Sequence, residues 1–154
     1  MAETLTQKNP RLIKSNHPME KQYVLTEDSK TWYKGQFGAY SSGVATPIAT
    51  NATSIQVVFL SDQTTSSSST YCWVGLITSD MIFEGFELDS AVTAAIMEQQ
   101  GVDVSNNLVT VDGGNTNYAV KVVDIASQYE PARNKSDDIK ARLRFKVLTS
   151  AIEA

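Results

Sequence analysis

The final strand-like segment of the chain alternates between apolar and basic side chains, and this pattern constrains the fold more than any other feature. The apolar members are Ile139, Ala141, Leu143, Phe145 and Val147, and the basic members between them are Lys140, Arg142, Arg144 and Lys146. Successive side chains of a β-strand point to opposite faces of a sheet, which sorts these residues onto two faces. The segment 139–147 is therefore predicted to be an antiparallel strand with one face in the core and one basic face.

Most of the remaining chain has patterns typical of short β-strands. Runs of β-branched and aromatic residues alternate with clusters of Gly, Ser, Asn and Asp that are typical of turns. The expected strands cover residues 23–25, 36–40, 54–60, 70–78, 81–88, 102–104, 108–111, 118–125 and 139–147. Residues 91–100 are predicted to form one short helix, because Asp89-Ser90 precedes an alanine-containing stretch that ends at Gly101.

These patterns predict a mainly β fold. We expect a single compact β-sandwich or barrel-like domain of about seven to nine short strands, with one short helix. The first 21 residues differ from the rest, because Pro10 and Pro18 disfavour both a helix and a central strand. The expected organisation is therefore an extended N-terminal arm over residues 1–21 and a β-rich domain over residues 22–154.

The N-terminal arm carries a small apolar patch between basic residues. This combination makes the arm a candidate anchor to a partner, through Lys8, Arg11, Leu12, Ile13 and Lys14. A frayed terminus with no binding role is the alternative interpretation.

Charge is distributed unevenly along this chain, which has a net charge of −4 and a pI near 4.9. Residues 1–34 carry six bases and four acids, residues 35–132 one base and ten acids, and residues 133–154 six bases and three acids. The basic ends can fold back on the acidic middle, or they can contact an acidic partner. The basic face of Lys140, Arg142, Arg144 and Lys146 can be balanced by carboxylates on a neighbouring strand, by an acidic subunit or capsid surface, or by a nucleic-acid backbone. The low pI argues against a duplex-DNA partner.

The sequence contains no motif of a common enzyme chemistry. His17 and Cys72 are the only histidine and cysteine, and neither a phosphate-binding glycine motif nor a serine-nucleophile elbow occurs. We therefore predict no catalytic residue, no cofactor and no metal, and we expect Cys72 to be a buried, inert thiol. The enzymatic alternative is a glycan-degrading enzyme that uses Glu84 and Glu87. No apolar stretch approaches about 18 residues and no signal peptide is recognisable, so no membrane partner is expected.

Several short motifs resemble those of the small capsid decoration proteins of tailed bacteriophages. The first is Lys34-Gly35-Gln36-Phe37 followed by Ser42-Gly43, and the second is the stretch from Trp73 to Glu84. The segments 101–103, 109–112, 120–124 and 142–147 then fit the same strand order. The resemblance covers residues 30–150 and rests on spacing and strand order, and neither the predicted helix, the Ser-rich segment 61–69 nor the first 30 residues have a counterpart in it.

The resemblance implies a structural protein without enzymatic activity. Such proteins bind the major capsid protein on the outer surface of the expanded head, commonly as homotrimers, and cement adjacent capsomers. The implied location is the outer capsid surface of the virion, after synthesis in the bacterial host cytoplasm, with neither a nucleic-acid nor a membrane partner. The alternative is a small carbohydrate- or receptor-binding β module of a phage particle, in which Trp32, Tyr33 or Tyr40 would stack on sugar rings.

Overall fold

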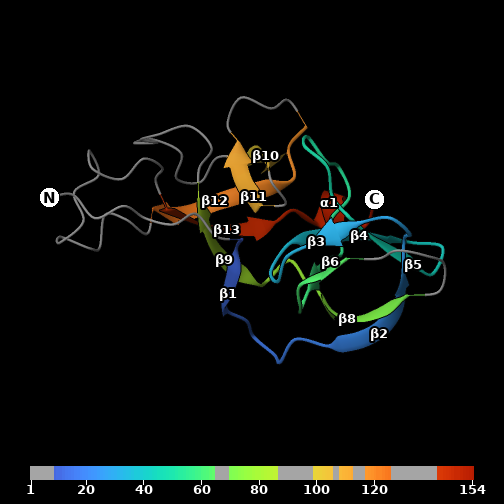
Figure 1. Cartoon of the computed structure of the whole chain (residues 1–154). Helices are drawn as coiled ribbons and strands as arrows, with labels where there is room; N and C mark the ends of the chain where they lie inside the picture. Colours follow the sequence, from blue (N-terminus) through green and yellow to red (C-terminus); the bar gives the residue numbers. More distant parts are fainter. Residues whose placement is uncertain (1–8, 65–69, 87–98, 106–107, 113–116, 126–141) are drawn as a thin grey trace, which may run out of the picture.

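The computed structural model describes residues 9–64, 70–86, 99–105, 108–112, 117–125 and 142–154. Within these residues, thirteen β-strands and one short helix, α1 (Thr149–Ile152), form a barrel packed beside a sheet (Figure 1). The predicted mainly β fold is confirmed. The described strands outnumber the expected seven to nine because several of them span only two to four residues, which is too short for a recognisable alternation.

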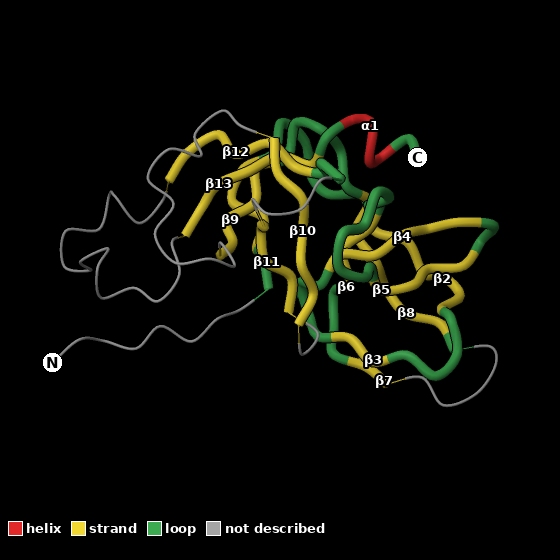
Figure 2. Tube along the Cα trace, turned by 90° about the horizontal axis from the view of Figure 1, so that it is seen from above, coloured by secondary structure: helices red, strands yellow, loops and turns green. Residues whose placement is uncertain are grey.

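The barrel is closed and contains five strands in the order β2-β5-β4-β6-β8. These strands are β2 (Lys21–Thr26), β4 (Phe37–Ser41), β5 (Val44–Pro47), β6 (Val57–Phe59) and β8 (Tyr71–Leu76). The β2–β5 pair is parallel, and the other neighbours in the barrel are antiparallel. Two shorter strands, β3 (Thr31–Trp32) and β7 (Gln63–Thr64), pair with each other at one end of the barrel (Figure 2).

The second layer is a six-stranded sheet in the order β1-β9-β13-β12-β10-β11, and every pair in it is antiparallel. Its strands are β1 (Arg11–Lys14), β9 (Ile82–Phe86), β10 (Gln99–Ser105), β11 (Leu108–Asp112), β12 (Val120–Ile125) and β13 (Arg142–Val147). The first and last of the described strands thus flank β9, and β1 forms an edge of the sheet.

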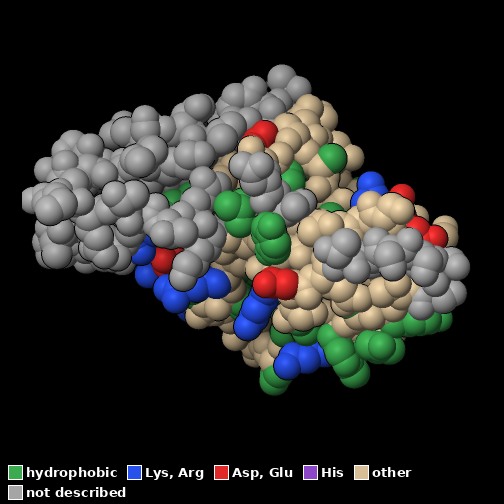
Figure 3. All heavy atoms as spheres, in the orientation of Figure 1, with side chains coloured by type: hydrophobic (Ala, Val, Ile, Leu, Met, Phe, Trp, Pro, Cys, Tyr) green, Lys and Arg blue, Asp and Glu red, His purple; other side chains and the backbone are tan. Residues whose placement is uncertain are grey.

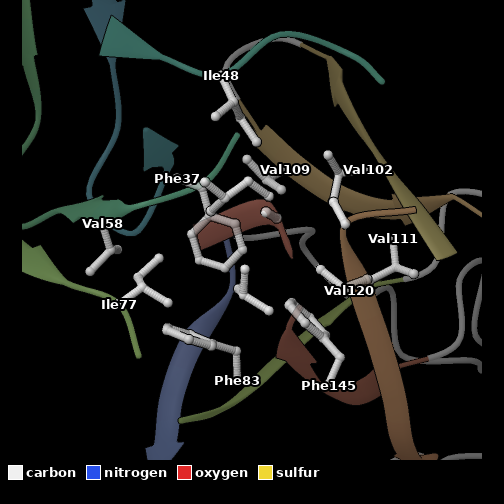
Figure 4. Packing of buried hydrophobic residues seen from close by; sticks show 14 of the residues in the cluster. Phe37, Ile48, Val58, Ile77, Phe83, Val102, Val109, Val111, Val120 and Phe145 are labelled. Atoms are coloured by element: carbon white, nitrogen blue, oxygen red, sulfur yellow. The ribbon is translucent and has the colours of Figure 1, made fainter. Parts of the chain in front are cut away.

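The barrel and the sheet share one hydrophobic core (Figure 4). Phe37 of the barrel packs edge-on against Phe83 of β9, with ring centroids 5.1 Å apart, and against Phe145 of β13 at 6.2 Å. A second cluster fills the barrel itself, where Trp32 stacks on Phe59 with a centroid distance of 4.4 Å. Because aromatic rings from both layers interlock, the described residues form one structural unit.

The predicted alternation of apolar and basic side chains is confirmed in β13. Leu143, Phe145 and Val147 are at most 1% exposed and belong to the shared core. Arg142, Arg144 and Lys146 alternate with them and therefore lie on the opposite face of the sheet. Residues 139–141 of the predicted strand lie outside the described residues.

The N-terminal segment differs from the prediction of a separate arm. Over the described residues 9–21, the segment packs onto the domain: β1 pairs with β9, and Leu12 and Met19 contact the shared core. Pro10 precedes β1 and Pro18 follows it, so both prolines lie where they break no ladder hydrogen bond. The predicted boundary after residue 21 is therefore corrected, because Lys21 already belongs to the barrel strand β2.

The predicted helix 91–100 is corrected at its C-terminal end. Residues 91–98 lie outside the described residues, and Gln99 and Gln100 begin the strand β10 by pairing with β12. The helix that the structure does describe, α1, follows β13. The Gln56 side chain of the barrel donates hydrogen bonds from Nε2 to the carbonyl oxygens of Ala151 (3.2 Å) and Ile152 (3.1 Å), which ties α1 to the barrel.

Candidate partner-binding surface

One row of side chains with alternating charge crosses four neighbouring strands of the sheet. Arg11 of β1 lies opposite Glu84 of β9, which in turn lies opposite Arg144 of β13. On its other side, Arg144 lies opposite Asp124 of β12. Side chains at opposed positions share a sheet face, and opposite charges there attract each other. This row therefore links the basic segment at the start of the chain to the basic strand near its end.

Glu84 is the centre of this row and contacts three guanidinium groups. Its Oε1 atom lies 3.3 Å from Arg142 Nη1 and 3.6 Å from Arg11 Nη2, and its Oε2 atom lies 3.5 Å from Arg144 Nε. The Glu84 side chain is 9% exposed, as against 11% for Arg142, 38% for Arg144 and 75% for Arg11. A carboxylate this buried is stable only when cations and hydrogen bonds replace its lost water.

Part of the positive charge predicted for the strand 139–147 is thus balanced within the chain, as one of the three interpretations predicted. The balancing carboxylate is Glu84 on the neighbouring strand β9. Of the two carboxylates that the enzymatic alternative requires, Glu84 is held in these ion pairs and Glu87 lies outside the described residues.

The outer face of the sheet keeps an excess of positive charge after this pairing. Across β1, β9, β13 and β12, register places on it the bases Arg11, Lys14, Lys121, Arg142, Arg144 and Lys146 and the acids Glu84 and Asp124. Lys121 and Lys146 lie directly opposite each other, which is unfavourable without a counter-charge. We call these eight residues the basic face. It combines Arg11 and Lys14 of the predicted anchor with three of the four bases predicted on one face of the strand 139–147, whereas Lys8 and Lys140 lie outside the described residues.

β1 is an edge strand, and among the described strands it pairs only with β9. Its register shifts between Leu12 and Lys14, and Ile13 at this irregularity is 37% exposed. The outer edge of such a strand presents backbone groups that a further strand can pair with. The predicted anchor residues Arg11 to Lys14 therefore lie on a sheet edge instead of a free arm.

An apolar hollow of about 470 Å³ lies on the inner face of β1, opposite to the basic face, where the sheet meets the barrel. Its lining includes Pro10, Leu12, Met19, Leu60 and Phe83. Figure 3 shows hydrophobic side chains gathered between the two layers, with Lys and Arg side chains beside them. The volume falls in the range of sites that take a side chain or a small ligand.

The segment between β1 and β2 is held to the turn before β9 by a polar cluster. His17 Nε2 lies 3.3 Å from Thr78 Oγ1 and 3.4 Å from Asp80 Oδ1, and Asn16 N donates to Asp80 Oδ2 at 3.0 Å. The hydrogen bond of the His17 ring to the Pro18 carbonyl raises the pKa of His17, and the Asp80 charge adds to this. Hydrogen bonds from Thr78 and then from Asn16 lower the pKa of Asp80 to about 2.

The aromatic residues proposed for sugar stacking lie in different environments. Trp32 is fully buried inside the barrel, which removes it as a stacking residue. Tyr33 and Tyr40 are 44% and 37% exposed.

Three other aromatic residues, which the sequence reasoning missed as surface residues, are more exposed: Tyr23, Tyr71 and Trp73. The alternation in β8 was the available signal, because Cys72 between the last two points inward and is 3% exposed. Burial raises the pKa of the Cys72 thiol to about 11, which agrees with the predicted buried, inert thiol.

Comparison with known proteins yields no relative: no family model, no curated protein and no solved structure matches the chain. Among the described residues, no helix has the length and apolar character needed to cross a membrane. In the same part of the chain, no three His, Cys, Asp or Glu side chains come together as a metal site would require.

Proposed function

We propose that this protein is a capsid decoration protein of a tailed bacteriophage, which binds the outer surface of the head and cements adjacent capsomers of the expanded, DNA-filled particle. The motif resemblance over residues 30–150 and the mainly β domain support this proposal. The observation that carries it is the position of β1, an exposed sheet edge with the basic face on one side and the apolar hollow on the other.

The major capsid protein is the proposed partner, and β1 suggests how it would dock. A strand of the capsid protein would pair with the open edge of β1. An acidic side chain of that strand would meet Lys14, other acidic side chains of the capsid surface would meet Lys146 on β13, and an apolar side chain would enter the hollow. The resemblance implies a homotrimer, in which several modest contacts made at once would hold far better than one. The protein would be made in the host cytoplasm and reside on the outer capsid surface.

Charge reversal on the basic face tests this proposal. We expect the double variant Lys14→Glu/Lys146→Glu to reduce the number of copies bound to heads that lack the protein by at least about tenfold, since it opposes like charges across the interface. Both lysines lie outside the ion pairs of Glu84. Bound copies are counted by densitometry after the heads are sedimented.

The matched control is Lys21→Glu/Lys30→Glu, which makes the same charge change at exposed positions in and next to the barrel. It should bind like the original protein. Equal binding of both double variants would refute a role for the basic face. Failure of the unaltered protein to bind heads would refute the decoration function itself. Truncation before residue 21 is a poor test, because it would remove β1 and its core contacts along with any anchor.

A further inference from the structure

The outer wall of the barrel carries a cluster of three exposed aromatic side chains. Tyr23 of β2 lies opposite Trp73 of β8, and Tyr71 follows on the same face of β8. The Tyr23 ring centroid is 5.3 Å from that of Trp73 and 5.5 Å from that of Tyr71, at interplanar angles of 50° and 18°. The three residues are 58%, 53% and 47% exposed for Tyr23, Trp73 and Tyr71. We call them the aromatic cluster. Exposed aromatic residues that are grouped in this way, instead of scattered singly, mark binding surfaces.

A hollow of about 420 Å³ lies beside the cluster, and its walls are chemically mixed. Trp73 and Leu60 supply apolar surface, Ser61 supplies a hydroxyl group, and Lys21 supplies the only charge among the described residues of the lining. The ligand that fits must therefore have an apolar face for the indole, polar groups around its rim and a negative charge for the ammonium group.

We infer that the aromatic cluster and this hollow bind a polysaccharide made of carboxylated pyranose rings, such as a hexuronate polymer. The C–H groups on one face of a pyranose carry partial positive charge and pack against the electron-rich face of Trp73. The sugar carboxylate pairs with Lys21, and the Ser61 hydroxyl bonds to a ring hydroxyl. Tyr23 on β2 and Tyr71 on β8 extend the aromatic surface for the next sugar of the polysaccharide.

The charge pattern favours this ligand over a single-stranded nucleic acid. A nucleic-acid groove lines the path of the backbone with several cations, whereas the described part of the chain places one cation, Lys21, in the lining of this hollow. The inference does not rest on capsid binding, which was assigned to the sheet layer and the hollow beside β1; Leu60 lies between the two hollows and lines both, and every proposed variant keeps it unchanged.

Affinity electrophoresis tests the inference. The protein is run through gels that contain polygalacturonate and, for comparison with an uncharged polysaccharide, through gels that contain amylose. The protein should be retarded by polygalacturonate and much less by amylose. Trp73→Ala should weaken polygalacturonate binding by at least about tenfold, the effect of losing one aromatic stacking partner. Lys21→Met should weaken it about threefold or more and reduce its dependence on salt, because the charge pair is lost. Tyr118→Ala, which removes an exposed tyrosine outside the cluster, should bind normally.

The two tryptophans allow folding and binding to be read separately. Trp32 is fully buried and reports folding in every variant, whereas Trp73 is half exposed and should become protected from acrylamide quenching when polygalacturonate is added. Unchanged retardation of a folded Trp73→Ala variant would overturn the inference, as would equal retardation by amylose. So would a change of oligomeric mass in Trp73→Ala without polysaccharide binding, which would assign the cluster to a contact between copies.

Discussion

Replacing Glu84 by glutamine should destabilise the protein by about 3 kcal/mol, most of it from a single ion pair. The variant keeps the size of the side chain but leaves three guanidinium groups without their shared carboxylate. Arg142 is nearly as buried as Glu84, and removing one partner of a buried pair costs about 3–5 kcal/mol at the extreme. Arg144 is 38% exposed and Arg11 75% exposed, so solvent screens their shares to about 0–1 kcal/mol each.

Urea unfolding at pH 7, followed by circular dichroism, measures this cost. For a urea slope of about 2 kcal/mol/M, the unfolding midpoint should fall by about 1.5 M. Arg11→Ala should cost under about 1 kcal/mol, because its ion pair is exposed at one end. The exposed Glu20 provides the matched control, and Glu20→Gln should stay within about 0.5 kcal/mol of the original protein. A Glu84→Gln cost below about 1 kcal/mol, or an Arg11→Ala cost equal to it, would refute the reasoning from burial.

Two further predictions concern packing and pH. Gly38→Ala should lower the free energy of unfolding in urea by about 2–3 kcal/mol, because its Cβ would lie 2.7 Å from Cε2 of the buried Phe59. Gly43→Ala has open space around its Cβ but a φ of 80°, so it should lower the free energy of unfolding by only about 1 kcal/mol. The opposite ranking would contradict the packing argument. The raised pKa of His17 means that its protonated form stabilises the fold below the ordinary value of 6.5 and loses this effect as pH rises through the raised value. The lowered pKa of Asp80 gives a contribution that is fully present above the ordinary value of 3.8 and is lost as pH falls from there to about 2. The urea midpoint of the original protein should therefore exceed that of Asp80→Asn most clearly between pH 4.5 and 6, and the difference should shrink by pH 8; a difference that grows with pH would have the wrong sign.

Local patterns were sufficient where apolar and charged side chains alternate along a strand. The alternation of β13 predicted both the core residues Leu143 and Phe145 and the basic side chains of its opposite face, because a strand has a fixed period of two. The β character of most segments followed from the same reasoning. Cys72 was likewise predicted to be buried, from the apolar run that surrounds it.

The candidate surface needed the tertiary structure, because its members are brought together from distant parts of the chain. Arg11, Glu84 and Arg144 meet only because β1 and β13 both pair with β9, and no local pattern predicts which strands pair. Prolines near the N-terminus indicated an arm, yet β1 lies in the gap between them, and core contacts outweigh weak local preference.

The two tryptophans show the difference between what the sequence predicts and what the tertiary structure decides. Both lie in short apolar segments, and the apolar character of the indole predicts burial for both. By itself the sequence determined a β chain with an acidic middle, basic ends and one strand with two clearly different faces. Tertiary structure alone decided that Trp32 is enclosed by the barrel and that the face of β8 with Trp73 is left exposed, because alternation separates the two faces of a strand without saying which of them is covered.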